Sequence, residues 1–202
     1  MATKEDILEQ LVEEYLLHQG YFVRHNIKFL PDPKHPDFVK NQDSNHSDID
    51  VIGLHPKKRG VDRVVVVSCK SWQSGFNPKN EIRKIEEGKT SAGRDAWRRF
   101  RELAIPKWSA AFLDTVEAET GSRRFVYTLA VTRLHGDKSV WETHQRFRDA
   151  LEDNPIRLLT FREMVTAIDQ SLAMKKNMLA GTEVGRMLQL FRAADFGLCL
   201  GS

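Results

Sequence analysis

The feature that most constrains the fold is a run of four consecutive valines, Val64 to Val67, with no polar residue among them. A strand that leaves one face to water alternates apolar and polar residues, so an unbroken apolar run indicates a strand covered on both faces. β-Branched residues also favour extended backbone. We therefore expect this segment at the centre of a sheet with helices on both sides.

A partner strand is expected directly before the valines. Residues Asp48 to Leu54 are followed by HPKKRGV, whose proline and glycine flank a basic tip. This pattern is typical of an antiparallel hairpin whose second strand runs from Arg63 to Lys70.

The N-terminal segments predict one helix, one strand and one loop. Apolar residues recur at helical spacing over residues 8–16, with Thr3 as a candidate N-cap and Gly20 where the helix ends. Residues 21–30 are rich in aromatic and branched side chains, which favours a strand. Residues 31–45 are expected to form an exposed loop.

The C-terminal half predicts alternating helices and strands. Residues 78–118 are expected to be mainly helical, with an interruption at Pro106. Thr160 and Glu163 form a capping-box pattern at the start of a helix. The other expected elements are a strand over 124–132, a helix over 140–151, a strand over 156–159 and a helix over 183–194.

This order of elements predicts one mixed α/β domain over residues 1–177 and a C-terminal helical appendage over residues 178–202. The 202 residues are 41% hydrophobic, which supplies one compact core. The apolar stripe of the last helix is expected to pack on that core or on a second subunit; its members are Val184, Met187, Leu188 and Phe191.

Composition excludes several classes of protein. No apolar run is long enough to span a bilayer, and the charged N-terminus is unlike a secretory signal, so we expect a soluble, cytoplasmic protein without membrane contacts. The two cysteines, Cys69 and Cys199, are too few and too far apart for a structural zinc site. A net charge of +3 is compatible with nucleic-acid binding.

Both strands of the expected hairpin carry polar pairs. Asp48 and Asp50 share one side of the first strand, because side chains alternate along a strand, and Ser68 and Lys70 share one side of the second. A turn centred on Lys57 to Gly60 pairs residues whose numbers sum to about 118, which places Asp50 opposite Ser68 and diagonal to Lys70, roughly 5 to 8 Å away. Charge beside a buried strand is costly unless it is paired or bound to an ion. The pattern favours a metal-and-phosphate site; an ordinary cross-strand salt bridge is the alternative.

The two segments SDIDVIGL and VVVVSCKSW resemble the active-site hairpin of the PD-(D/E)XK, or restriction-endonuclease-like, nucleases. Within this superfamily the chain is most similar to Mrr-like restriction enzymes, because LEQLVEEYLLHQGYFV places Glu9 eleven residues before Gly20, as in their first helix. FVYTLAVT and IRLLTFREMVTAI resemble their later strands and helix. The resemblance covers most of the chain and implies a three-layer α/β core, with a central mixed sheet of about five strands flanked by helices.

The resemblance also implies catalytic roles. Asp50 would bind Mg²⁺ or Mn²⁺, with Glu9 as a ligand from the first helix. Position 68 would provide another oxygen ligand, and Lys70 would help to activate water and offset charge. Magnesium accepts hard oxygen ligands and lowers the pKa of its water, and an ammonium stabilises developing negative charge.

One position departs from the family pattern, because residue 68 is a serine instead of an acid. A neutral hydroxyl is a poorer magnesium ligand than a carboxylate, so activity would need compensation from Glu9, Glu13 or Asp48. Gln73 and Trp72 follow the lysine and are expected either to contact the substrate backbone or, for the indole, to pack against the first helix.

Basic residues outnumber acids between Lys79 and Lys107, nine against five. A helix with this excess could follow a phosphate backbone, although mixed-charge helices are also common as plain solvated surface. The residues expected to contact nucleic acid are Lys79, Arg83, Lys84, Arg94 and Arg98.

The sequence thus predicts a divalent-metal-dependent endonuclease that hydrolyses DNA. Two active sites would be needed to cut both strands of a duplex, so double-stranded DNA as substrate is compatible with a homodimer, and the oligomeric state stays open. A nuclease-fold binding or scaffold protein that no longer cuts is the main alternative, motivated by Ser68. A nucleotide-sugar transferase with a DxD motif is a weaker alternative, because there the acids close a strand, whereas here Val51 to Leu54 continue it. A small-molecule α/β enzyme is also weaker, since no Gly-rich phosphate loop, nucleophile elbow or HExxH pattern occurs.

Overall fold

The computed structural model describes residues 7–91, 93–174, 180–194 and 196. Its centre is a five-stranded mixed sheet in the order β1-β2-β3-β6-β7. The strands β1, β2 and β3 are antiparallel neighbours, whereas β3, β6 and β7 are parallel. Their bounds are β1 (Phe22–Phe29), β2 (Ser47–Leu54), β3 (Val64–Lys70), β6 (Val126–Val131) and β7 (Ile156–Thr160). The prediction of an α/β fold with a five-stranded mixed sheet flanked by helices is confirmed.

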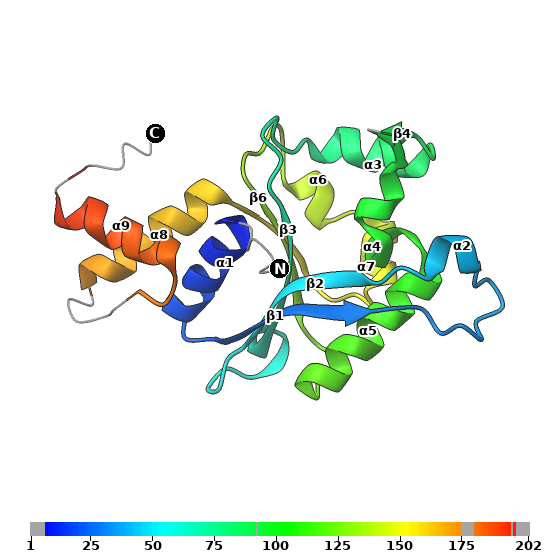
Figure 1. The fold of residues 1–202 in the computed structure, drawn as a ribbon, viewed down its shortest axis with the longest axis horizontal. Coiled ribbons are helices and arrows are strands. Elements are labelled where there is room, and N and C mark those ends of the chain that lie inside the picture. The colour runs from blue at the N-terminus through cyan, green and yellow to red at the C-terminus, as the bar shows by residue number, and fades with distance from the viewer. Residues whose placement is uncertain (1–6, 92, 175–179, 195, 197–202) are drawn as a thin grey trace.

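Helices cover both faces of this sheet (Figure 1). One face carries α1 (Ile7–His18), α8 (Phe161–Met174) and α9 (Glu183–Ala193). The other carries α3 (Pro78–Glu86), α4 (Arg101–Ala104), α5 (Pro106–Thr120), α6 (Ser139–Glu142) and α7 (Gln145–Ala150). None of the helices in the described ranges has the length and apolar character needed to cross a bilayer.

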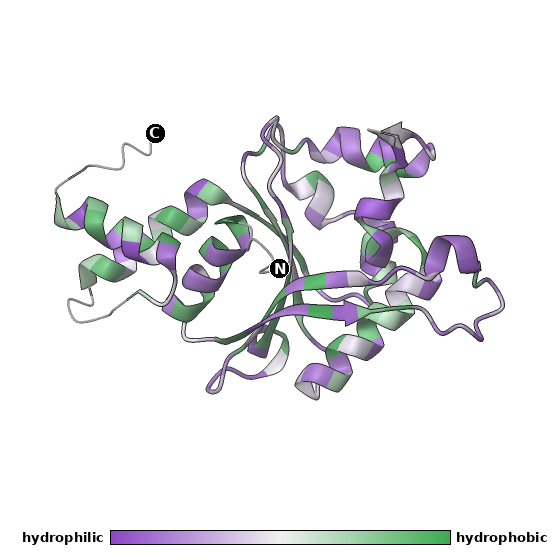
Figure 2. Ribbon diagram, in the orientation of Figure 1, coloured by the Kyte–Doolittle hydropathy of each residue, from purple (hydrophilic) through white to green (hydrophobic). Residues whose placement is uncertain are grey.

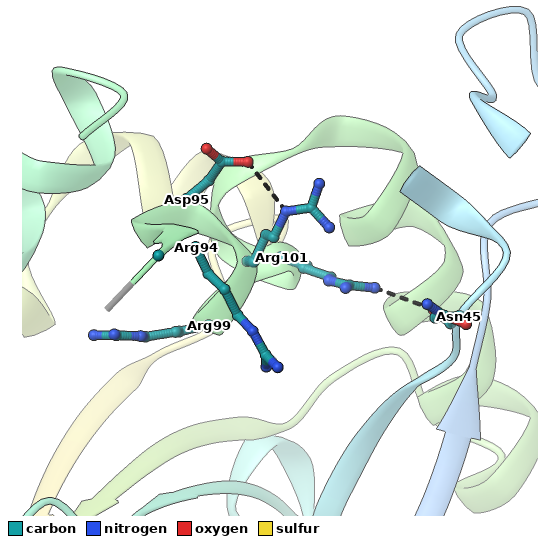
Figure 3. A pocket seen from close by; sticks show the side chains of 7 residues that line it. Asn45, Arg94, Asp95, Arg99 and Arg101 are labelled. Atoms are coloured by element: carbon teal, nitrogen blue, oxygen red, sulfur yellow. Dashed lines mark hydrogen bonds and ion pairs between the residues drawn. The ribbon is translucent and has the colours of Figure 1, made fainter. Parts of the chain in front are cut away.

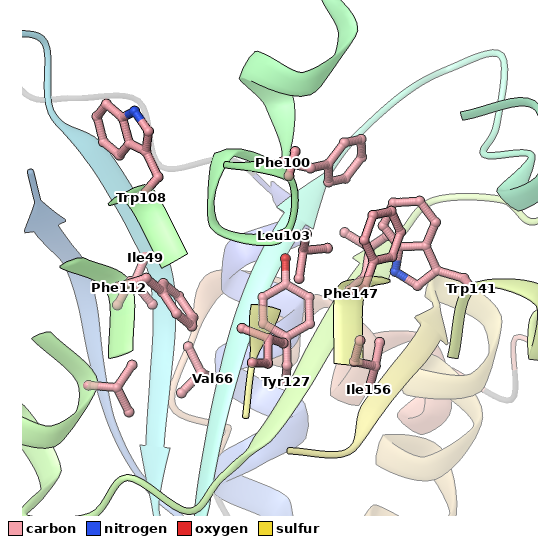
Figure 4. Packing of buried hydrophobic residues seen from close by; sticks show 14 of the residues in the cluster. Ile49, Val66, Phe100, Leu103, Trp108, Phe112, Tyr127, Trp141, Phe147 and Ile156 are labelled. Atoms are coloured by element: carbon pink, nitrogen blue, oxygen red, sulfur yellow. The ribbon is translucent and has the colours of Figure 1, made fainter. Parts of the chain in front are cut away.

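The valine run occupies the centre of the sheet, as predicted. Val64 and Val66 pack in one hydrophobic cluster with aromatic side chains such as Trp108 and Tyr127, and Figure 4 shows this packing around Val66. Val65 and Val67 pack in a second cluster with Leu11 of α1. Because successive side chains point to opposite faces, this one strand contributes to both halves of the core.

Two segments differ from the sequence predictions. The expected loop over 31–45 contains a one-turn helix, α2 (Lys40–Asp43), in which Asp43 is fully buried. Asp43 accepts hydrogen bonds from Val39 N (2.7 Å), Lys107 Nζ (2.5 Å) and Trp108 Nε1 (3.0 Å). These bonds tie the segment to α5, so it is ordered by one buried carboxylate.

The second difference lies between residues 87 and 100, which are not mainly helical. Here β4 (Thr90–Ser91) and β5 (Arg94–Asp95) form an antiparallel pair of short strands; Gly88 (φ 62°) lies before β4 and Gly93 (φ 73°) lies between the two strands. A 3₁₀ turn, η2 (Ala96–Arg99), follows. Glycine adopts positive φ without steric cost, which permits this reversal. Likewise the helix expected over 140–151 is divided into α6 and α7.

The capping box at the start of α8 is confirmed. Glu163 N donates to Thr160 Oγ1 (3.2 Å), and Thr160 N donates to Glu163 Oε2 (2.8 Å). The N-cap proposed for α1, Thr3, lies outside the described residues.

Helix α9 packs on α1 and α8 through a buried carboxylate. Glu14 of α1 accepts hydrogen bonds from Gly181 N (3.0 Å), Thr182 N (2.8 Å) and Thr182 Oγ1 (2.9 Å). A Cβ at Gly185 would lie 2.3 Å from the Glu14 carboxyl carbon, so a larger residue here would displace the carboxylate. Of the predicted apolar stripe, Leu188 is buried and Val184 and Phe191 pack beside it, but Met187 is 55% exposed. That residue does not join the core.

Replacement of Glu14 is expected to destabilise the protein. Glu14→Ala leaves the Thr182 and Gly181 donors without their acceptor, which costs about 2 kcal/mol. Although burial raises the pKa of Glu14, hydrogen bonds from His18 and Thr182 hold it below the ordinary value. The carboxylate therefore stabilises the fold above the pKa of an unfolded glutamate, and this contribution is lost as pH falls through the lower folded pKa.

Urea unfolding of Glu14→Ala at neutral and acidic pH measures both effects. The exposed Glu183→Ala serves as a control on α9. Equal unfolding free energies for the two variants at neutral pH would contradict the role of Glu14.

Candidate active site at the fork between β2 and β3

The two central antiparallel strands diverge at Asp50. Cross-strand pairs run from Leu54 with Val64 to Val51 with Val67, which is the predicted register. At the next position the Asp50 carboxylate accepts a hydrogen bond from Cys69 N (2.5 Å). The Asp50 side chain thus replaces the backbone acceptor at the position where the pairing of β2 with β3 ends. Figure 1 shows β1 and β2 crossing β3 and β6 at a steep angle.

Ser68 lies at the centre of the polar groups at this fork. Lys70 Nζ donates to Ser68 Oγ (2.9 Å), and the nearby serine hydroxyl lowers the pKa of the Asp50 carboxyl and of the Tyr127 phenol. The serine is only 9% exposed. The structure therefore brings together three of the predicted site residues, Asp50, Ser68 and Lys70.

A fourth polar group at the fork was not predicted. Glu102 of α4 is 6% exposed, and its Oε1 accepts a hydrogen bond from Tyr127 Oη (2.6 Å). Figure 4 shows the Tyr127 hydroxyl pointing from β6 toward the residues of α4. The ammonium of Lys70 lies over the ring of Phe100, 5.9 Å from the ring centroid. Phe100 precedes Glu102 by two residues in the chain. Because Glu102 sits in a basic segment, only its burial marks it as unusual.

The electrostatics of the two carboxyl groups are coupled. Burial raises the pKa of Asp50 above the ordinary value. The charge of Lys70 and the hydrogen bond from the Cys69 N–H lower this pKa, and the charge of Asp48 raises it. Burial likewise raises the pKa of Glu102, Lys70 and Tyr127 lower it, and Asp50 raises it. The charge of Lys70 therefore lowers the pKa of both acids, and the charge of Asp50 raises that of Glu102.

The other predicted acids lie around this cluster. Asp48 is exposed and pairs across the strands with Lys28. Glu13 forms an ion pair with His25 of β1 (3.2 Å). Glu9 lies one turn before Glu13 on α1, the helix that covers the face of Val65 and Val67. Ser68 and Lys70 alternate with those valines and belong to the opposite face.

Several of the predicted nucleic-acid contacts line two polar depressions near the fork. Arg94 and Arg98 line a cavity of about 880 Å³, and Gln73 and Lys84 line one of about 800 Å³. Both cavities include Arg99. The remaining two residues, Lys79 and Arg83, are exposed on α3. The basic residues are thus distributed over several elements, not along one helix.

Trp72 does not pack against the first helix. Its ring lies near Phe76 (5.7 Å) and Phe100 (6.1 Å), and the Arg99 guanidinium lies over it at 5.1 Å. The indole therefore belongs to the α3–α4 side of the sheet and supports a basic side chain.

The donors at the fork fit a magnesium ion that keeps much of its water. In the part of the chain that the structure describes, no three His, Cys, Asp or Glu side chains are grouped as a metal site. Magnesium, however, is commonly held by one or two carboxylates together with waters and substrate oxygens. Asp50, Glu102 and the Ser68 hydroxyl offer such a set.

Comparisons of this chain with protein-family models, with curated proteins and with solved structures find no match. The nuclease resemblance consequently stays a prediction that depends on the residues at the fork and on the order of the elements.

Removal of the ammonium is expected to raise the pKa of both buried acids. In Lys70→Met the chain length is kept but the charge is lost, and Lys70 lowers the pKa of Asp50 and of Glu102 in the native protein. Carboxyl ¹³C NMR titration measures both values. Lys57→Met, in the exposed β2–β3 connection, is the control. Unchanged pKa values in Lys70→Met would show that the three groups do not form one cluster.

Proposed function

We propose that the protein is a divalent-metal-dependent endonuclease that hydrolyses DNA phosphodiester bonds, with a restriction-endonuclease-like three-layer core. The observation that carries this proposal is the convergence of the Asp50 carboxylate, the Ser68 hydroxyl and the Lys70 ammonium where β2 and β3 diverge. A carboxylate and an ammonium at a forked sheet edge suit a reaction in which a phosphate gains negative charge.

Each residue has a separate task in the proposed reaction. Asp50 holds the metal, and Lys70 orients the attacking water and stabilises the charge that develops on the phosphate. When bound, Mg²⁺ or Mn²⁺ would polarise the phosphodiester and lower the pKa of water. Ser68 orients the lysine, because its hydroxyl accepts a hydrogen bond from Lys70 Nζ, and it lowers the pKa of Asp50.

Glu102 is our candidate for the second carboxylate ligand. The position that carries an acid in the resembled motif is the neutral Ser68 here, so a carboxylate is required from elsewhere. The charges of Asp50 and Lys70 both act on the pKa of Glu102, and Tyr127 Oη donates to Glu102 Oε1 (2.6 Å). Glu9, the acid expected from the resemblance, extends from a helix on the other face and is the competing candidate.

DNA cleavage is expected to be lost when either Asp50 or Lys70 is replaced. Asp50→Ala and Lys70→Ala should each reduce Mg²⁺-dependent DNA cleavage by roughly a hundredfold or more, as is typical when one group that stabilises the transition state is lost. Cleavage of supercoiled plasmid and of linear duplex, with circular dichroism to monitor folding, measures this. Lys57→Ala should keep full activity. Cleavage that persists in a folded Asp50→Ala variant would reject the proposed site.

The two candidates for the second acid give opposite outcomes. Glu102→Gln should weaken Mn²⁺ binding by at least about tenfold, whereas Glu9→Gln should change it little. Metal binding requires ionised carboxylates, so the affinity should also rise with pH through the raised pKa of Asp50. Calorimetry with Mn²⁺ alone measures these affinities without any need for turnover. Weaker binding only in Glu9→Gln would assign the role to the helix acid.

A nuclease-fold protein that binds DNA without cutting it is the second candidate, and Ser68 at an acid position is the observation that favours it. Undiminished DNA binding with no cleavage in Mg²⁺ or Mn²⁺ would support this alternative. If the substrate is duplex DNA, cleavage of both strands calls for a homodimer, which sedimentation in the presence of DNA would detect.

A further inference from the structure

The cavity beside α4 has an unusual charge composition. It has a volume of about 880 Å³ and is lined by Asn45, Gly93, Arg94, Asp95, Arg98, Arg99 and Arg101. Four guanidinium groups thus surround one carboxylate. Figure 3 shows the arginines arising from one stretch of backbone, with Asn45 facing Arg101 from the segment before β2. We call this the arginine pocket.

Neighbouring groups hold the arginines in place. Arg98 bonds Asp95 (3.1 Å) and lies over the Trp97 ring at 5.0 Å. Arg101 donates to the Asn45 carbonyl (3.1 Å) and lies over the Trp108 ring at 4.4 Å. Stacking on an aromatic ring orients a guanidinium without cancelling its charge. The pocket is therefore pre-organised and keeps a positive excess.

The arginines also repel one another. Burial lowers the pKa of Arg101, and the charge of Arg98 lowers it further. Like charges in one concavity are unfavourable unless an anion joins them, so the pocket suits an anionic ligand. Planar guanidinium groups match the oxygens of a phosphate in particular, because they donate two parallel hydrogen bonds.

The arginine pocket lies beside the candidate active site. Arg99 also lines the second polar cavity, whose wall includes Ser71, the residue after Lys70, and Gln73. Phe100, between Arg99 and Arg101, lies under the Lys70 ammonium. Asn45, which lines the arginine pocket, lies just before β2, and Ser71, which lines the second cavity, lies just after β3. Because β2 and β3 are antiparallel, both cavities lie at the end of the sheet where these strands diverge.

We propose that the arginine pocket binds a phosphate group of a nucleic-acid strand and so fixes the position of that strand relative to the fork. The phosphate is either a strand terminus or an internal diester, since both present the same oxygens. The link to cleavage rests on the proposed nuclease function, but the binding does not, because it requires no metal and no turnover.

The test is metal-free binding of DNA oligonucleotides to the full chain, measured by fluorescence anisotropy in EDTA. The probes are one sequence with a 5′-phosphate, the same sequence with a 5′-hydroxyl, and a circular form. The variant is Arg94→Ala combined with Arg98→Ala, two partly or fully exposed positions. The control is Arg186→Ala, an exposed arginine on α9 across the sheet. Arg98→Lys keeps the charge but not the planar donor pair.

The double variant should bind about tenfold more weakly or worse, and the slope of affinity against salt should fall by roughly one for each arginine removed. Arg186→Ala should bind like the native protein, and Arg98→Lys should be intermediate. A preference for the 5′-phosphate that disappears in the double variant assigns the pocket to a strand end; equal loss on all probes assigns it to the internal backbone.

Native affinity and salt slope in the double variant, or no DNA binding by the native protein, would overturn the proposal. The outcome is separate from that of the nuclease proposal. If the native protein binds DNA through these arginines but does not cleave it, the nuclease proposal is rejected and the phosphate-binding proposal stands. If the double variant still cleaves DNA and binds it with unchanged affinity, the phosphate-binding proposal is rejected and the nuclease proposal stands.

Discussion

The structure depends on the hydrogen bond between the Asp50 carboxylate and the Cys69 N–H. Where β2 and β3 separate, the backbone ladder ends, and an unpaired N–H inside the sheet would be costly. The carboxylate satisfies that donor, but it brings a charge into a buried place. Lys70 and Ser68 then become necessary on the neighbouring strand. One interruption of a β-ladder thus explains why a hydrophobic sheet carries an acid, a hydroxyl and an ammonium together.

The segment from Arg99 to Glu102 connects this cluster with the arginine pocket. Phe100 and Glu102 are buried toward the sheet, whereas Arg99 and Arg101 line the pocket. Neighbouring residues of one short stretch therefore face the acids on one side and a cavity of positive charge on the other. Because the packing of Phe100 against Trp141 (4.9 Å) and Trp72 fixes this stretch, the two sites keep a constant relative position.

The sequence was sufficient to predict the central sheet and the first three residues of the site. Val64 to Val67 identify a strand covered on both faces, and hairpin register alone places Asp50 opposite Ser68. Glu102 could not be predicted, because its hydrogen bond at the fork is to Tyr127 on β6, and no local pattern pairs residues so distant in the chain. The buried Asp43 was missed for the same reason: its partners Lys107 and Trp108 come from α5.

The two sites also depend on each other electrostatically. A pair of buried carboxylates with raised pKa values, Asp50 and Glu102, repels any phosphate that approaches, and one ammonium offsets only part of that repulsion. A divalent cation would reverse the sign locally, but a nucleic-acid strand carries charge along its whole length. In the nuclease that we propose, the excess of guanidinium groups beside α4 would offset the phosphates next to the scissile one. We therefore expect an acidic fork without the arginines to hold a metal and repel a nucleic-acid strand, and arginines without the fork to bind a strand and leave it intact.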